Sequence, residues 1–338
     1  MVFVKAGTDS GGTVVWLKPF RRGNYQFFRE WAAAAWARQG GRMLRDWRIP
    51  LKLRMVLGKA GLVRPFPNWL RGRRRVIVAA AGRVEYYCWP ACYRNEIVPV
   101  LWDCWPKYRD GLVRFVRTNR VRTIFCTSSQ TADMIRGKCP GVEAVWLPEG
   151  IDTSQYPMGA PLKERPVDVL EIGRTAGLLK ASLEDQVAHG EISYLHPAGD
   201  KLLFRDFAAL TAGLRNAKMT VCLPRCDTHP QEAGSVETLT QRYWECMLSG
   251  TLIVGRAPKE LVDFCGYDPV IALGDDPAAR IREVLADLPR YQELADKNRR
   301  FAEAHAGWSE RMKIIRRTLQ GNRNVEAYLA SLGSGEMI

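Results

Sequence analysis

The sequence contains no continuous apolar run of the roughly 18 residues that a membrane-spanning helix needs. Its beginning also has no charged stretch followed by an apolar one, which is the pattern of a secretory signal, so we expect a cytoplasmic protein. Histidine is scarce, with four residues, and the nine cysteines are an odd number. Because these cysteines lie in apolar or strand-like settings, we predict small buried thiols and neither a disulfide framework nor a zinc site.

Acidic residues are almost missing from the segment 42–75. It holds eleven arginines and lysines against a single acid, Asp46, and tryptophan and aliphatic residues are interleaved with them, in a chain whose net charge is +14 at pH 7. Three interpretations stay open. The segment is a solvated connecting helix, a peripheral contact with the anionic inner face of a membrane, where each cation gains about 1 kcal/mol, or a surface for nucleic acid.

The length of 338 residues exceeds one ordinary core and suits two domains of roughly 150 residues each. A hydrophobic content of 46% and a charged content of 25% are typical of a soluble globular protein. A proline-rich stretch separates the halves. We therefore predict an N-terminal domain over 1–150, a hinge over 151–166, a second domain over 167–320 and a tail over 321–338.

Short apolar runs alternate with helix-like stretches in both halves, which is typical of parallel sheets covered by helices on both faces. The predicted strands are 14–17, 76–80, 97–102, 122–126, 144–147, 167–173, 192–195, 219–223, 251–254 and 269–273. The predicted helices are 25–38, 108–117, 129–136 and 201–215, and 276–320 is expected to be mostly helical. The fold class is therefore α/β.

The stretch from Ser235 to Val254 predicts a helix from Glu237 to Gly250 that leads directly into a buried strand. On such a helix Glu237 and Glu245 project from nearly the same side, about 12 Å apart. The two oxygens of a carboxylate can accept hydrogen bonds from two hydroxyl groups in a fixed geometry, and a helix would hold two such carboxylates at a constant separation. The pair suits a ligand rich in hydroxyl groups.

This pair resembles the E-x7-E signature of retaining nucleotide-sugar glycosyltransferases of the family 4 type. Leu252 stands where that signature usually has proline, and in this the sequence resembles the subgroup named after the spore maturation protein CgeB. The segment 147–152, Leu-Pro-Glu-Gly-Ile-Asp, resembles the interdomain signature of the same family. Gly173-Arg174 with Lys180 resembles its donor-diphosphate grip. The resemblance implies the GT-B fold, two Rossmann-like domains facing a central cleft, with the donor on the C-terminal domain and the acceptor on the N-terminal one.

The resemblance also implies a reaction. A sugar, a hexose by expectation, would move from a nucleotide-diphosphate sugar to a hydroxyl of a glycan, a lipid-linked or another acceptor, with UDP favoured over GDP. Gly173, Arg174 and Lys180 would hold the diphosphate. Glu237 would orient the sugar, and Glu245 would bind the ribose.

Three further residues complete this assignment. Arg242 would add to the diphosphate clamp, and Asn24 and Asp103 are expected on the acceptor side because they follow predicted strands at the carboxyl edge of a sheet. Asp103 is counted with Glu237, Arg174 and Lys180 as a catalytic candidate.

The sequence contains no Asp-x-Asp motif. This absence fits a metal-independent enzyme without a cofactor, in which cationic side chains and helix dipoles stabilise the leaving diphosphate. The resemblance also implies that the enzyme retains the anomeric configuration. Three other functions stay open. They are a nucleic-acid-directed glycosyltransferase or basic nucleic-acid-binding protein, a sugar-nucleotide epimerase of the same fold, and a catalytically inactive nucleotide-binding member.

Overall fold

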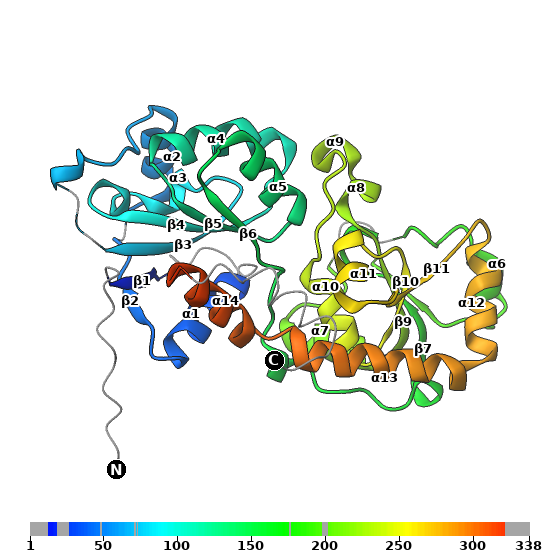
Figure 1. The fold of residues 1–338 in the computed structure, drawn as a ribbon. Coiled ribbons are helices and arrows are strands. Elements are labelled where there is room, and N and C mark those ends of the chain that lie inside the picture. Colours follow the sequence, from blue (N-terminus) through cyan, green and yellow to red (C-terminus); the bar gives the residue numbers. More distant parts are fainter. Residues whose placement is uncertain are drawn as a thin grey trace, which may run out of the picture. The chain divides into compact units, whose positions relative to one another are not determined.

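The computed structural model describes residues 13–18, 27–47, 49–70, 72, 74–175, 177–197 and 202–321. Internal contacts divide the chain into two units (Figure 1). Unit 1 runs to Leu147 and includes the segment that starts at Met312, and unit 2 runs from Pro148 to Arg311. Asn24, an acceptor-side candidate, lies outside the described residues.

Unit 1 is built on a six-stranded sheet in the order β2-β1-β3-β4-β5-β6, and every pair is parallel. The strands are β1 (Val14–Leu17), β2 (Arg42–Leu44), β3 (Arg75–Ala81), β4 (Glu96–Trp102), β5 (Thr123–Cys126) and β6 (Glu143–Trp146). β3 and β4 are almost fully buried apolar runs, as strands covered on both faces should be. All of these strands except β2 match the predicted ones closely at both ends.

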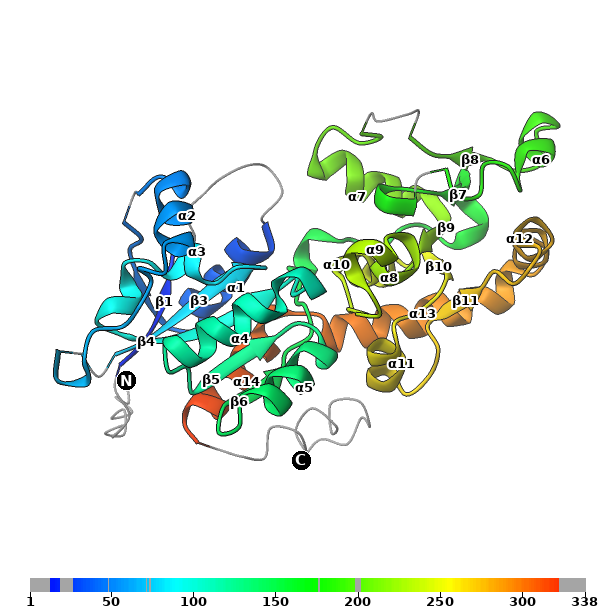
Figure 2. The same cartoon turned by 90° about the horizontal axis from the view of Figure 1, so that it is seen from above.

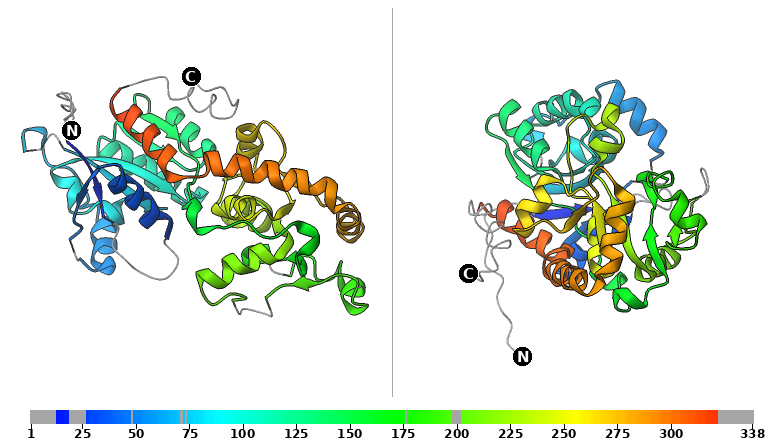
Figure 3. Two further views of the ribbon diagram at one scale, coloured as in Figure 1. Left: turned by 90° about the horizontal axis from the view of Figure 1, so that it is seen from below. Right: turned by 90° about the vertical axis from the view of Figure 1, so that its right-hand side faces the viewer.

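Helices cover both faces of this sheet (Figures 1 and 3). One face carries α2 (Leu51–Lys59), α3 (Glu85–Cys88), α4 (Arg109–Thr118) and α5 (Ser129–Lys138). The other carries α1 (Phe27–Arg38) and the part of α14 (Trp308–Leu319) that belongs to unit 1. On that second face, Trp16 and Trp36 bring their ring centroids to 6.0 Å.

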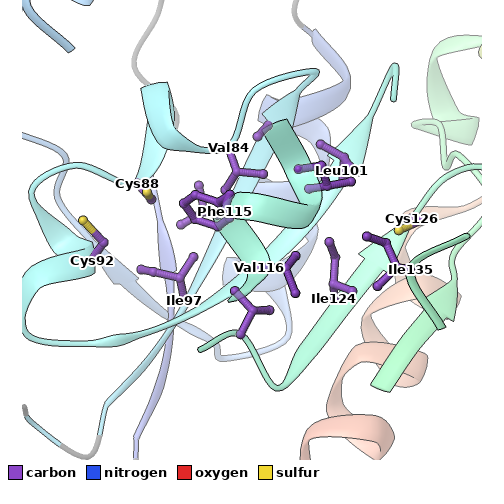
Figure 4. Packing of buried hydrophobic residues seen from close by; sticks show 14 of the residues in the cluster. Val84, Cys88, Cys92, Ile97, Leu101, Phe115, Val116, Ile124, Cys126 and Ile135 are labelled. Atoms are coloured by element: carbon purple, nitrogen blue, oxygen red, sulfur yellow. The ribbon is translucent and has the colours of Figure 1, made fainter. Parts of the chain in front are cut away.

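Cysteine is part of the apolar core of unit 1. Figure 4 shows Cys88, Cys92 and Cys126 among aliphatic side chains of the cluster between the sheet and α3, α4 and α5. All nine cysteines are free thiols, and all but Cys226 are buried. Burial raises the pKa of the Cys126 thiol, so this group stays protonated and behaves as a small apolar side chain. The prediction of buried thiols is confirmed for eight of the nine cysteines.

Unit 2 has a five-stranded parallel sheet in the order β11-β10-β9-β7-β8 (Figure 2). Its strands are β7 (Val167–Leu170), β8 (Tyr194–Leu195), β9 (Ala217–Cys222), β10 (Leu252–Gly255) and β11 (Val270–Ala272). Its helices are α6 (Glu184–Ala188), α7 (Phe207–Asn216), α8 (Arg225–Thr228), α9 (Pro230–Ala233), α10 (Gln241–Leu248), α11 (Lys259–Cys265), α12 (Pro277–Ala286) and α13 (Leu288–His305). One face of the sheet packs on α12 and α13 in a single apolar cluster.

Several sequence predictions need correction. The predicted strand 167–173 ends at Leu170, the predicted strand 192–195 begins at Tyr194, and the predicted helix 201–215 begins at Phe207. Strand β2 is absent from the predicted strands, because Arg42–Leu44 is a short edge strand whose side chains are mostly exposed and therefore leave no apolar pattern. The predicted helical stretch 276–320 is three helices, α12, α13 and α14. Asp276 and Asp287 cap the first two and a proline lies in each first turn, so each helix begins anew.

No helix within the described ranges is both long enough and apolar enough to cross a membrane.

Gly255 ends β10 under a steric constraint that can be measured. Its φ is +127°, and a Cβ atom there would lie 2.3 Å from the Cys222 carbonyl oxygen. Gly255→Ala should lower the free energy of unfolding by about 3 kcal/mol or more, because the backbone conformation and the overlap both oppose a side chain. The matched control is Gly266→Ala, where φ is +70° but no atom lies within 4 Å. Only about 1 kcal/mol should be lost there. Equal losses in urea unfolding would contradict the steric argument.

Candidate functional site

The strand order of unit 2 contains a topological switch point. From β7 the chain crosses to the neighbouring β8, then returns past β7 to β9 on its other side. Ligands of open parallel sheets bind outside the carboxyl ends of the strands at such a point, because the two connections leave in opposite directions and open a crevice. The segments that follow β7, β9 and β10 form what we call the carboxyl edge of unit 2, and their described residues are 171–175, 177–180, 223–240 and 256–260.

The segment after β7 holds three of the predicted diphosphate-binding residues. Gly173 has a φ of +75°. Glycine adopts this conformation without strain. The backbone of Arg174 follows in a short 3-10 turn, Gly173–Thr175, and its side chain lies outside what the structure describes. Lys180 is exposed in the next turn, where its amide donates to the Gly177 carbonyl over 3.3 Å. The structure thus places all three in one segment at the switch point.

Glu171 occupies the first position after β7 and is absent from the predicted site. Its carboxylate is completely buried, accepts the Leu179 amide at 3.2 Å and accepts the hydroxyl of Tyr194, which lies on β8. Burial raises the pKa of Glu171, although these hydrogen bonds act against the shift. Leu179 lies directly before Lys180, so the buried carboxylate ties the end of β7 to the turn that carries this lysine.

The predicted helix from Glu237 to Gly250 is wrong at its start. Helix α10 begins at Gln241, and Glu237 lies in the loop before it. The loop is held by bonds to another helix, because the Lys259 amide at the start of α11 donates to Glu237 over 2.7 Å, and the Leu239 amide donates to the buried Glu260 carboxylate. The argument that placed Glu237 and Glu245 on one helical face therefore does not hold.

Glu237 has a cationic partner that is absent from the predicted site. Arg256 donates to the Glu237 carboxylate over 2.5 Å and to both oxygens of Asp227 over 2.6 and 2.7 Å. The hydrogen bonds to Asp227 raise the pKa of Arg256 and lower that of Asp227. Gly255 ends β10 and Arg256 follows it, while Gly173 and Arg174 lie three and four residues after the end of β7. A Gly-Arg pair close to the carboxyl end of a strand is the signal that could have found Arg256.

Glu245 lies inside α10 and is only 7% exposed. The Tyr156 hydroxyl donates to one of its oxygens over 2.9 Å, and the Arg242 guanidinium lies 2.7 Å from the other. Burial and then the Glu245 charge raise the pKa of Tyr156. Burial is the largest effect on the pKa of Arg242 and lowers it, but the attraction of Glu245 and the smaller effects of neighbouring groups together outweigh it, so the net shift is upward. Two predicted residues, Arg242 and Glu245, are thus a half-buried ion pair one helical turn apart.

The segment 147–152 supports the start of α10. The Gln241 amide donates to the Glu149 carboxylate over 3.2 Å, so Glu149 satisfies an unpaired donor at the first turn of this helix. The Trp244 indole and the buried Arg311 guanidinium donate to the Glu149 carbonyl over 2.8 and 3.2 Å. These bonds give Glu149 a structural role at the start of α10.

In unit 1, Asp103 follows the carboxyl end of β4 and is exposed. Its φ is +53°. This is the left-handed region, which a residue other than glycine rarely adopts and which aspartate tolerates better than most. Backbone strain of this kind gathers at functional positions, which is consistent with the acceptor-side prediction but does not test it.

No three histidine, cysteine, aspartate or glutamate side chains come close enough to hold a metal ion in the part of the chain that the structure describes.

No protein-family model matches the sequence, and the search of curated proteins gives no significant match. Solved structures do match. A sucrose-phosphate synthase from Thermosynechococcus elongatus has a TM-score of 0.56 at 12% identity, covering 92% of this chain and 99% of its own. Alr3699/HepE from Anabaena, solved in complex with UDP, has a TM-score of 0.55 at 10% identity, covering 91% and 100%.

AviGT4, a glycosyltransferase involved in avilamycin A biosynthesis, has a TM-score of 0.52 at 16% identity and covers 91% of this chain and 98% of its own. Identities this low show the fold alone. The chain has the fold of the GT-B glycosyltransferases, with two parallel-sheet α/β units, and the predicted fold class is confirmed. Membership of the family 4 type and of the CgeB-like subgroup stays a prediction.

The buried Glu171 should give the protein a pH-dependent loss of stability. Its pKa in the folded protein is raised above the ordinary 4.5. The unfolded chain therefore releases this proton at a lower pH than the folded one. The free energy of unfolding should fall as the pH rises from 4.5 toward the folded pKa, and Glu171→Gln should remove that fall. The control is Glu184→Gln at an exposed position on α6. Parallel stability-pH curves for wild type and Glu171→Gln would contradict this account.

Proposed function

We propose that the protein is a glycosyltransferase that moves a sugar from a nucleotide-diphosphate sugar to a hydroxyl acceptor. The observation that carries the proposal is the Gly173-Arg174 turn at the switch point between β7 and β9, in a chain that shares its fold with glycosyltransferases over more than nine-tenths of its length. The UDP complex of a protein with this fold favours UDP as the nucleotide, with GDP second.

The carboxyl edge of unit 2 offers the chemistry that a diphosphate needs. Glycine at 173 lets the backbone approach a phosphate closely, and Arg174 and Lys180 supply positive charge from the same segment. In the reaction the bond between the anomeric carbon and the diphosphate oxygen breaks, and the acceptor oxygen bonds to that carbon. The acceptor proton leaves on the departing diphosphate. Cations at 174 and 180 favour the charge that develops on the leaving group, without a metal ion or a cofactor.

Glu237 is the carboxylate that we assign to the hydroxyl groups of the transferred sugar. It is partly exposed at the carboxyl edge, and Arg256 and the Lys259 amide hold it in one orientation. Arg256 is a positioning residue, since it acts through Glu237 and Asp227. Retention of the anomeric configuration, through front-side attack and an oxocarbenium-like state, is part of the proposal because the E-x7-E resemblance implies it.

Glu245 and Arg242 are assigned to the ribose and to the diphosphate clamp. A carboxylate offers about four hydrogen-bonding positions, so Glu245 retains capacity for ribose hydroxyls beside the two partners that fix it. On unit 1 we assign the acceptor hydroxyl, carried by a glycan, a lipid-linked or another acceptor, to the carboxyl edge at Asp103, with Asn24 as its second candidate.

The donor site is tested by thermal stabilisation with UDP, GDP and their sugar derivatives. A ligand at about 100 times its Kd adds about 2.7 kcal/mol to the free energy of unfolding. We expect a clear shift with one nucleotide, and its loss in Arg174→Ala together with at least a ten-fold drop in turnover, since a charge-assisted hydrogen bond contributes about 1.5–3 kcal/mol. The control is Arg300→Ala at an exposed position on α13.

An Arg174→Ala variant that keeps both the shift and the turnover would contradict the diphosphate role. Chromatography of the products separates the enzyme classes. Release of the nucleoside diphosphate only when an acceptor is present supports glycosyl transfer, and an isomerised sugar nucleotide formed without an acceptor contradicts it.

A further inference from the structure

Helix α2 of unit 1 buries a charged side chain and exposes two apolar ones. Arg54 is 3% exposed and pairs with Asp46 over 2.9 Å, while Val56 is 61% exposed and Leu53 is 47% exposed. These two apolar side chains are three positions apart and so share one face of the helix. The exposed face of α2 therefore combines these apolar side chains with the cations of Lys52 and Lys59.

Further exposed apolar side chains follow the helix in the sequence. Leu62 is 53% exposed and Trp69 is 80% exposed, although Phe66 between them is anchored by stacking on Tyr93 at a ring distance of 5.0 Å. We call Leu53, Val56, Leu62 and Trp69 the apolar rim. A cluster of exposed aliphatic and tryptophan side chains within one short segment marks a contact surface, whereas single exposed apolar residues do not.

A cationic groove of about 310 Å³ opens next to this rim, among residues of α2, α3 and α4, which cover the same face of the sheet (Figure 1). Four cations line it, Lys59, Arg64, Arg83 and Arg114, against one carboxylate, Glu85. Glu85 lies 3.4 Å from Arg83 and offsets only part of this charge. The groove therefore selects an anionic ligand with more charge than one carboxylate supplies.

Asn119 adds a specific polar group to the same groove. The residue is 2% exposed, and its amide nitrogen donates to the Val63 and Phe115 carbonyls over 3.3 and 3.2 Å. Its side-chain oxygen is buried and has no hydrogen-bond partner among the described residues. A buried acceptor without a partner destabilises the fold, so a ligand that donates a hydrogen bond here would remove that penalty.

We propose that this groove binds the headgroup of an anionic phospholipid while the apolar rim enters the membrane interface. The phosphate would lie among Lys59, Arg64, Arg83 and Arg114, and a headgroup hydroxyl would donate to Asn119. Three of the four rim residues, Leu53, Val56 and Leu62, are aliphatic and provide no stacking surface for a base, which favours a lipid over nucleic acid. This site is independent of the proposed sugar transfer, since all of its residues belong to unit 1.

Gly111 provides a test that preserves the fold. It lies on α4, lines the groove, and a Cβ atom there would meet no atom within 4 Å. Gly111→Glu fills the groove with a carboxylate and improves helix propensity, so the variant should fold at least as stably as wild type. Gly137→Glu is the matched control, because Gly137 lies on α5, is equally unobstructed and does not line the groove.

The measurement is co-sedimentation with vesicles of phosphatidylcholine alone and of phosphatidylcholine mixed with phosphatidylglycerol in equal parts. We expect wild type and Gly137→Glu to bind only the mixed vesicles, and Gly111→Glu to bind at least five-fold more weakly, about the effect of one cation near the surface. The double variant Val56→Gln, Leu62→Gln, which keeps the net charge, should also bind less.

Three results would overturn the proposal. They are equal binding of Gly111→Glu and Gly137→Glu to the mixed vesicles, failure of wild type to bind them, and displacement of the protein from them by a single-stranded oligonucleotide but not by inorganic phosphate at the same ionic strength. None of these measurements contains a nucleotide sugar, so a failure here leaves the donor-site test unaffected, and a failure of the donor site leaves this one intact.

Discussion

The parallel direction of the strands is the constraint on which the rest of the structure depends. In both described sheets each strand runs parallel to its neighbours, so every connection must return along the outside of the sheet and the carboxyl ends gather at one edge. In unit 2 this brings together three segments that lie far apart in the chain, the turn after β7, the loop after β9 and the Gly255-Arg256 step after β10. The candidate site is a consequence of this topology.

The arginines of this chain have two kinds of role, one structural for buried side chains and one in ligand attraction for exposed side chains. Arg165 and Arg311 are buried and donate to backbone carbonyls, Arg165 to Ala160 and Ser249 and Arg311 to Pro148. Burial lowers the pKa of Arg311 to about 9, yet the group stays charged at neutral pH. These side chains hold loops in place. The exposed cations of the carboxyl edge and of the groove in unit 1 remain to attract anionic ligands, as the net charge of the chain suggests.

The strands could be predicted from the sequence because each buried strand is a short, continuous apolar run. The fold class could be predicted because such runs alternate with helices. Prediction failed where tertiary contacts decide. The sequence around Glu237 is typical of the start of a helix, but its carboxylate accepts a hydrogen bond from α11. Nothing in the neighbouring sequence indicates that contact. Glu171 was missed because a carboxylate at a strand end gives no sign of burial, and Arg256 because its two acidic partners come from distant loops.

The most direct test of the central claim, that the carboxyl edge of unit 2 binds a nucleoside diphosphate, is amide hydrogen exchange with and without saturating UDP or GDP. We predict slower exchange in residues 171–180, 223–240 and 256–260, with little change in α12 and α13 on the packed face of the same sheet. Protection confined to other segments, or no protection by either nucleotide, would contradict it.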